Sequence, residues 1–216
     1  MTTIKLGYWG IRGRGQVPRL LLSYTGLEWE NVAYTDPAQW FGNDKLNLGF
    51  DFPNLPYLID GDLKLSESDA IERYVIEKSG KKELLGKNAH DAAKVNEVVG
   101  VFGDVRMHVV GKLFFDPEYE SKVKQTWELV KPKLDFFQKF VGEKEWTLGY
   151  LTLADFIIAE NSYYLEKVYP EEYKSYPALQ RIRDNIENLP EIKEYYAKPN
   201  AIKGPFLPPQ RASIKL

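Results

Sequence analysis

The pattern of apolar residues changes once, near residue 80, and this change constrains the fold more than any other feature of the sequence. Before it, strand-length and helix-length apolar segments alternate; after it, apolar residues recur at three- and four-residue steps to about residue 198. A charged linker, Gly80-Lys81-Lys82-Glu83, separates the two parts. We therefore expect an α+β protein of two domains, residues 1–83 and residues 84–216, the second of them all-helical.

The first part predicts the order β-α-β followed by β-β-α. Strands at 4–9 and 29–34 flank a helix that Gly26 ends. A turn at Asp60-Gly61-Asp62 joins two short strands in a hairpin, and Ser66 or Ser68 is placed to cap the next helix. The segment between the second strand and Asn54 is expected to be a loop.

The second part predicts long helices. Apolar spacing indicates helices over 92–113, over 119–141 and over 177–196, and another that starts at Thr152. Thr152 and Asp155 have the spacing of a capping box at that start. Pro132 lies inside the second of these helices and predicts a kink.

Composition excludes several kinds of chemistry. The 216 residues contain no cysteine and two histidines, His90 and His108, which argues against disulfides, cysteine-ligated metals and a histidine-based triad. The net charge of −2 disfavours nucleic acid and anionic membranes as partners. No apolar run approaches a membrane span and no basic, apolar leader opens the chain, so we expect a soluble, cytoplasmic protein.

Tyr8 is the residue whose type and position favour a functional site. It ends the first strand, just before a glycine-rich turn into a helix, and sites form at strand ends in open α/β sheets. Its hydroxyl can donate to an anion near the amino end of that helix. The alternative is a core tyrosine that satisfies a buried acceptor. Gly13-Arg14-Gly15 is not a dinucleotide loop, because Pro18 occupies the position of the third glycine.

Several motifs carry a resemblance to a known family. They are Gly7-Tyr8-Trp9-Gly10-Ile11-Arg12-Gly13, the run from Leu48 to Gly61 with Asn54-Leu55-Pro56, Ser66-Glu67-Ser68-Asp69-Ala70-Ile71, Asp116-Pro117-Glu118-Tyr119 and Phe206-Leu207-Pro208. Together they resemble a cytosolic glutathione S-transferase of the Mu class over nearly the whole chain. The resemblance implies a thioredoxin-like domain that holds glutathione, a helical domain that supplies most of the electrophile pocket, and a homodimer.

The resemblance also implies roles for individual residues. Tyr8 would be the catalytic hydroxyl that stabilises the glutathione thiolate. The residues expected to bind glutathione are Trp9, Arg14, Trp40, Lys45, Asn54, Leu55, Pro56, Glu67, Ser68 and, from the other subunit, Asp104. Pro56 resembles the family's cis-proline. Phe52 would enter a pocket of the partner subunit, with Arg73 near the two-fold axis.

Some positions depart from the Mu pattern. Glu67 stands where the Mu class has glutamine, Arg14 resembles the Sigma class, and the loop between Thr35 and Trp40 is short. The electrophile pocket is expected to include Met107, Val110 and Phe115, and Phe115 replaces a second active-site tyrosine. Arg14 is open to two interpretations, a cation beside that pocket or a solvated or tripeptide-facing side chain.

These observations predict a glutathione transferase that adds the thiolate to small hydrophobic electrophiles, with glutathione as co-substrate and no metal or other cofactor. The alternative enzyme is a Sigma-like prostaglandin isomerase. The alternative of another class is a non-catalytic ligand carrier or structural descendant. Retention of Tyr8, Asn54, Pro56 and Ser68 together favours catalysis.

Overall fold

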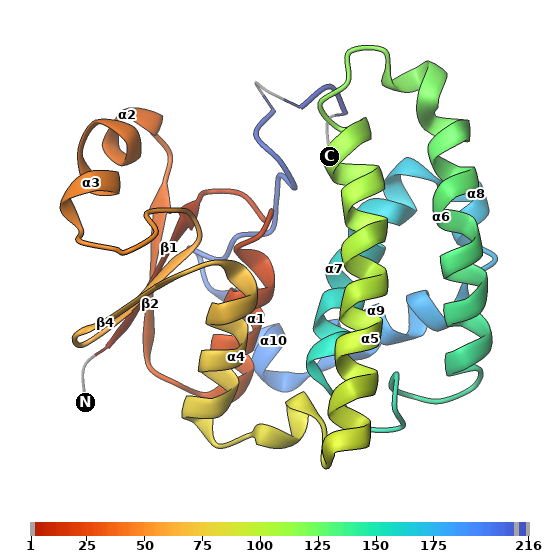
Figure 1. The fold of residues 1–216 in the computed structure, drawn as a ribbon, viewed down its shortest axis with the longest axis horizontal. Coiled ribbons are helices and arrows are strands. Elements are labelled where there is room, and N and C mark those ends of the chain that lie inside the picture. The colour runs from red at the N-terminus through yellow and green to blue at the C-terminus, as the bar shows by residue number, and fades with distance from the viewer. Residues whose placement is uncertain (1–2, 210–211, 215–216) are drawn as a thin grey trace. The chain divides into compact units, whose positions relative to one another are not determined.

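The computed structural model describes residues 3–209 and 212–214 and divides the chain into two compact units (Figure 1). The first unit comprises Met1–Lys82 and Pro190–Gly204, and the second comprises Glu83–Leu189 and Pro205–Leu216. The sequence had placed everything after residue 83 in one helical domain. The structure instead assigns the last helix to the first unit.

The first unit is a four-stranded mixed sheet with helices. Its elements are β1 (Ile4–Trp9), α1 (Gln16–Thr25), β2 (Trp29–Tyr34), α2 (Pro37–Gln39), η1 (Trp40–Asp44), α3 (Lys45–Asn47), β3 (Tyr57–Asp60), β4 (Leu63–Ser66), α4 (Ser68–Ser79) and α10 (Pro190–Ala197). The strand order is β2-β1-β3-β4, with β1 parallel to β2 and the other pairs antiparallel (Figure 1). The predicted β-α-β and β-β-α order is confirmed.

Polar contacts explain why α10 belongs to the first unit. The Arg12 guanidinium and the Gln16 amide both donate to the Tyr196 hydroxyl of α10, each at 3.2 Å. The Gln16 amide also donates to the carbonyl of Ile202, just after this helix, at 3.1 Å. Arg12 and Gln16 are 5% and 0% exposed, so these bonds satisfy polar groups that burial would otherwise penalise. The single helix expected over 177–196 is therefore wrong. The chain is extended at Leu189 and begins a new helix at Pro190.

Two further expectations for the first unit are wrong. The segment before Asn54 is not a plain loop but contains α2, η1 and α3, in which η1 is a π-helical turn. Neither serine caps α4, because Glu67 occupies the N-cap without a side-chain cap and Ser68 is the first helical residue. A π-turn differs from an α-helical turn by only one additional residue between the bonded groups, so the spacing of apolar residues does not reveal it.

The second unit is all-helical. The 3₁₀ turn η2 (Lys82–Leu85) leads into it, and its further elements are α5 (Ala89–Arg106), η3 (Met107–Leu113), α6 (Tyr119–Val141), α7 (Leu153–Val168), α8 (Pro170–Tyr173) and α9 (Pro177–Asn188). The predicted bounds of α6 match the structure. The helix expected to 113 changes to π-helical geometry at Met107, which the sequence did not indicate. Helix α7 is the core helix, with eleven of its sixteen residues buried.

Helix α7 begins with the predicted capping box. The Asp155 carboxylate accepts from the backbone N–H and hydroxyl of Thr152 at 2.8 and 2.9 Å, and from the same two groups of Thr147 at 2.8 and 2.6 Å. All three residues are fully buried. Burial raises the pKa of the Asp155 carboxyl, and the four donors oppose that rise. A buried polar cluster with every partner present fixes the start of the helix.

We expect Thr152→Val to lower the free energy of unfolding by about 1–2 kcal/mol, because it removes the capping hydroxyl without changing side-chain shape. Thr25→Val is the matched control, since the Thr25 hydroxyl is bonded to the carbonyl of Leu22 at a half-exposed helix end. Water can replace that bond, so the change should stay within about 0.5 kcal/mol. Urea denaturation at one fixed protein concentration measures both. Equal losses would show that the capping box contributes nothing special.

Candidate active site

Tyr8 lies on β1, with 7% of its side chain exposed. Its hydroxyl oxygen accepts the backbone N–H of Arg14 at 3.0 Å. The hydroxyl is the acceptor in this bond, so its own hydrogen is available to a second group. A hydroxyl polarised in this way is a better donor to an anion.

The glycine-rich turn makes room for the Tyr8 ring. A Cβ on Gly13 would lie 2.6 Å from the Tyr8 hydroxyl, and a Cβ on Gly15 would lie 2.5 Å from the ring. Gly13 also has a φ of +44°, in the region that favours glycine. The Arg19 guanidinium carbon lies 5.7 Å from the centre of the Tyr8 ring, and the guanidinium N–H groups donate to the carbonyls of Ile11 and Trp9. The sequence did not predict a buried cation at this position.

The structure brings four of the predicted site residues into one apolar cluster. Tyr8, Trp40 and Leu55 are buried in it, and Trp9 packs against it. Trp9 also contacts Tyr34 and Phe41, with ring centroids 6.1 and 5.9 Å apart. Residues from β1, η1 and the segment before β3 thus meet around Tyr8.

Asn54, Leu55 and Glu67 are joined by hydrogen bonds. The Asn54 side chain accepts the backbone N–H of Leu55 at 2.9 Å and donates to the Glu67 carboxylate at 2.9 Å. The Leu55–Pro56 peptide is cis, as the resemblance implied. Glu67 has a φ of +70°, a conformation that no other non-glycine residue adopts among residues 3–209 and 212–214. Such strain clusters at functional sites and here accompanies a charged residue at the start of α4.

Ser68 opens α4 and is 6% exposed. The first N–H groups of a helix have no intrahelical acceptor, and the helix dipole favours negative charge beside them. Its hydroxyl lies 3.4 Å from the Asp69 carboxylate, a long and weak contact. A carboxylate is the kind of ligand that these N–H groups and this hydroxyl can bind.

Two predicted residues lie in the turn after β2. Trp40 is 2% exposed and Lys45 is half-buried, with its ammonium 5.7 Å from the centre of the Phe41 ring. The backbone N–H of Lys45 donates to the carbonyl of Trp40 and closes the π-turn. The Arg14 side chain is exposed, and its backbone rather than its guanidinium contacts Tyr8.

The predicted residues of the second unit lie on α5, on η3 and just beyond η3. The Asp104 carboxylate forms an ion pair with Lys133 at 2.8 Å, and the hydrogen bond from Lys133 lowers the pKa of Asp104. Met107 and Phe115 are 55% and 47% exposed, whereas Val110 is 6% exposed and belongs to the core. Two of the three residues expected in the electrophile pocket therefore present apolar surface.

Phe52 and Arg73 lie on the surface of the first unit, and Phe52 is 78% exposed. In the second unit, a groove of about 430 Å³ lies between α5 and α6. Apolar side chains make up most of its lining, namely Val98, Val101, Pro132, Phe136, Phe137 and Phe140. Phe136 and Phe140 are 72% and 40% exposed, which is unusual for aromatic residues of this size.

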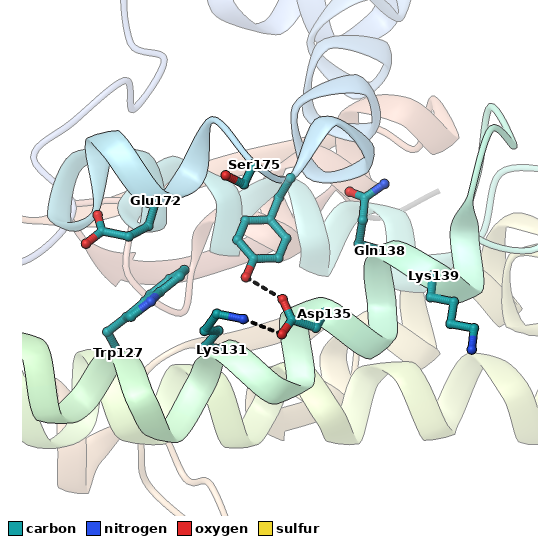
Figure 2. A pocket seen from close by; sticks show the side chains of 8 residues that line it. Trp127, Lys131, Asp135, Gln138, Lys139, Glu172 and Ser175 are labelled. Carbon is teal, nitrogen blue, oxygen red and sulfur yellow. Dashed lines mark hydrogen bonds and ion pairs between the residues drawn. The ribbon is translucent and has the colours of Figure 1, made fainter.

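A second groove of about 430 Å³ in the helical unit contains no predicted site residue. Trp127 is one of its lining residues, and Tyr176 and Lys131 both donate to the Asp135 carboxylate, at 2.8 and 2.6 Å (Figure 2). Within the described part of the chain, no cluster of three or more histidine and acidic side chains has a metal-binding arrangement. None of the described helices has the length and apolarity to cross a bilayer.

Comparison with known proteins identifies the family. The profile of the glutathione S-transferase N-terminal domain matches residues 4–77, and that of the C-terminal domain matches residues 103–199. The class-mu 26 kDa isozyme 51 of Fasciola hepatica is 36% identical over 205 residues, which is 94% of this chain and 92% of that protein. Glutathione S-transferase Mu 2 of Homo sapiens is 35% identical over 201 residues, 88% of each chain.

Solved structures agree with this assignment. The crystal structure of the glutathione S-transferase Blo t 8 matches with a TM-score of 0.85 at 27% identity, over 97% of this chain and 99% of that one. Rat hPGDS complexed with a quinoline matches with a TM-score of 0.80 at 25% identity, over 95% of this chain and 100% of that one. The chain belongs to the glutathione S-transferase family, and its curated relatives named here are of the Mu class. The predictions of family, enzyme class and fold class are thereby confirmed.

Proposed function

We propose that this protein conjugates glutathione to small hydrophobic electrophiles and that Tyr8 activates the glutathione thiol by hydrogen bonding to its thiolate. The observation that carries the proposal is the bond from the Arg14 N–H to the Tyr8 hydroxyl, which leaves the hydroxyl hydrogen for the sulfur. The buried Arg19 guanidinium favours negative charge near the Tyr8 ring. Glutathione is the co-substrate, and the reaction needs no metal or other cofactor.

The chemistry requires a thiolate. A free thiol has a pKa of about 8.5 and is mostly protonated at neutral pH, and each unit of pKa depression corresponds to about 1.4 kcal/mol. A donor aimed at the sulfur favours the charged form. With an aryl halide, the sulfur forms a bond to the ring carbon, the carbon–halogen bond breaks, and halide leaves. The thiol proton passes to solvent when the thiolate forms.

The tripeptide is held along the edge of the first unit. Leu55 pairs its backbone with the cysteinyl part, which requires its N–H to leave the Asn54 side chain. Ser68 and the N–H groups of α4 bind the γ-glutamyl carboxylate, Glu67 faces the amino group, and Trp40 and Lys45 bind the glycine carboxylate. Trp9, Pro56 and Arg14 complete the proposed glutathione-binding residues.

We also propose a homodimer in which the exposed Phe52 of one subunit enters the apolar groove between α5 and α6 of its partner. Burying a phenylalanine contributes about 1.5–3 kcal/mol, and two-fold symmetry doubles that contribution. Arg73 lies near the two-fold axis. Asp104 reaches the γ-glutamyl amine bound to the partner, in competition with its own ion pair to Lys133. A cytoplasmic location stays a prediction.

Isothermal titration with glutathione, followed by conjugation to chlorodinitrobenzene, tests the proposed function. We expect saturable binding at one site per subunit and turnover of the aryl halide. Binding without turnover favours the ligand carrier, and rapid isomerisation of a prostaglandin endoperoxide favours the Sigma-like enzyme. Absence of glutathione binding contradicts the proposed function itself.

The residue at position 115 is expected to decide between electrophiles. Phenylalanine has no hydroxyl to donate to an oxyanion, whereas aryl halides spread their negative charge into the ring. We therefore expect the wild-type protein to open epoxides slowly. Phe115→Tyr should raise the rate of epoxide opening by roughly threefold to tenfold. The gain is smaller than that of a full oxyanion-hole donor, because the surrounding residues do not orient the new hydroxyl. Aryl-halide conjugation should change less than twofold.

Parallel kinetics with an aryl epoxide and chlorodinitrobenzene measure this difference. Leu129→Tyr is the control, because it places the same hydroxyl at another exposed apolar residue of the second unit, one that does not line the groove of the proposed dimer. Fast epoxide opening by the unmodified protein would refute the argument.

A further inference from the structure

A chain of buried hydroxyls connects β2 and β3 to the turn that carries Trp40 and Lys45. Tyr34, the last residue of β2, is 1% exposed and donates to the Asp44 carboxylate at 2.6 Å. The Tyr57 hydroxyl lies 3.1 Å from that of Tyr34. The single hydrogen of Tyr34 is given to Asp44, so Tyr57 must donate to Tyr34. Burial raises the pKa of both tyrosines, which keeps both hydroxyls protonated.

The same two tyrosines enclose the Trp40 ring. Tyr34 contacts it edge-on with centroids 5.6 Å apart, and Tyr57 stacks on it with centroids 6.0 Å apart and an interplanar angle of 24°. Trp40 begins the π-turn, Asp44 ends it, and the Lys45 N–H closes it on the Trp40 carbonyl. Aromatic packing thus fixes one end of the turn, and the bond from Tyr34 to Asp44 fixes the other.

The hydrogen bonds to Asp44 also determine what Lys45 can bind. One Asp44 oxygen accepts from Tyr34 and the other from the Asn43 amide at 2.6 Å, and both donors are neutral. No ion pair to Lys45 occurs among the residues that the structure describes, although Asp44 precedes it in the chain. The Lys45 ammonium can therefore pair with an external anion without first breaking an ion pair to Asp44.

We propose that Tyr34 and Asp44 are positioning residues for the glycine carboxylate of glutathione, holding the π-turn so that Trp40 and Lys45 meet that carboxylate and Asp44 does not neutralise Lys45. This inference rests on the proposed function, because it assumes that glutathione is bound. It concerns one end of the ligand only. In this proposal Tyr34 and Asp44 act through Trp40 and Lys45, and not on the thiol or the γ-glutamyl group.

The test compares glutathione with γ-glutamylcysteine, which has the same thiol and γ-glutamyl group but lacks glycine. We expect Tyr34→Phe to raise the dissociation constant for glutathione about threefold to tenfold, the usual range for losing one hydrogen bond, and that for γ-glutamylcysteine less than twofold. In conjugation assays the KM for glutathione should rise with it, while kcat at saturating glutathione stays unchanged. Asp44→Ala should weaken glutathione binding with the same selectivity. It replaces Tyr34→Phe as the test variant if Tyr34→Phe folds poorly.

Tyr74→Phe is the matched control, because Tyr74 is also bonded to an aspartate, Asp60, in the first unit. It should alter neither dissociation constant. Equal losses for the two ligands in Tyr34→Phe and Asp44→Ala would indicate a merely structural role and overturn this inference, as would no loss for either ligand. A wild-type protein that binds neither ligand would overturn the proposed function and this inference with it.

Discussion

Replacing Tyr8 by phenylalanine is expected to lower aryl-halide conjugation at neutral pH by roughly ten- to a hundredfold, since a hydrogen bond to a charged group contributes about 1.5–3 kcal/mol. The affinity for glutathione should remain nearly unchanged. The substitution removes the proposed bond to the sulfur and the acceptor of the Arg14 N–H, while the other proposed contacts with the tripeptide stay in place. The loss should shrink as the pH rises, because the thiol then ionises without help.

Steady-state kinetics across a pH series measure this effect, with Tyr74→Phe as the control that removes a hydroxyl elsewhere in the first unit. The control should stay within twofold of the wild type. A Tyr8→Phe protein with full activity at neutral pH would exclude Tyr8 as the activating group. A large loss of glutathione affinity would instead show that Tyr8 binds the ligand in its ground state.

Replacing Phe52 by glutamate is expected to convert the proposed dimer to monomers. The substitution removes an apolar side chain that is 78% exposed within the subunit. It places a negative charge at a groove lined mostly by valine, proline and phenylalanine, with Lys94, Glu97 and Lys133 also in the lining. Both symmetric sites are lost at once, which doubles the effect on association. Glutathione binding should also weaken, because Asp104 no longer reaches the partner's ligand.

Sedimentation velocity measures the oligomeric state at several protein concentrations. Leu46→Glu is the matched control, since Leu46 is an apolar residue of the first unit that is 80% exposed. This variant should remain dimeric. An intact dimer in Phe52→Glu, or dissociation in both variants, would contradict the role of Phe52.

Long elements with a regular apolar period could be predicted from sequence. The hairpin of β3 and β4, helix α6 and the capped start of α7 follow from local signals, and each lies where it was expected. Features that depend on residues distant in the sequence could not be predicted in this way. Helix α10 joins the first unit through Arg12 and Gln16, which precede it by more than 170 residues. From the spacing of apolar residues alone, α9 and α10 were predicted as one continuous helix.

Local signals place Tyr8 near a strand end and Ser68 at a helix start, and both lie there in the structure. The catalytic role of Tyr8 and the binding role of Ser68 stay predictions. In the sequence, Tyr34 has the features of an ordinary core aromatic residue in a strand. No sequence pattern predicts its hydrogen bond to Asp44, ten residues later. Its role becomes visible only when the π-turn brings the carboxylate to the buried hydroxyl. The pairing of Asp104 with Lys133 was missed for the same reason, because the two residues lie on different helices.

Ultraviolet titration of glutathione bound to the protein tests the central claim most directly, because thiolate absorbance reports the pKa of the bound thiol. We expect that pKa to lie well below the value of about 8.5 for a free thiol in the wild type, and to rise by about 1–2 units in Tyr8→Phe. A bound thiol that titrates at the same pH in both proteins would show that Tyr8 does not stabilise the thiolate.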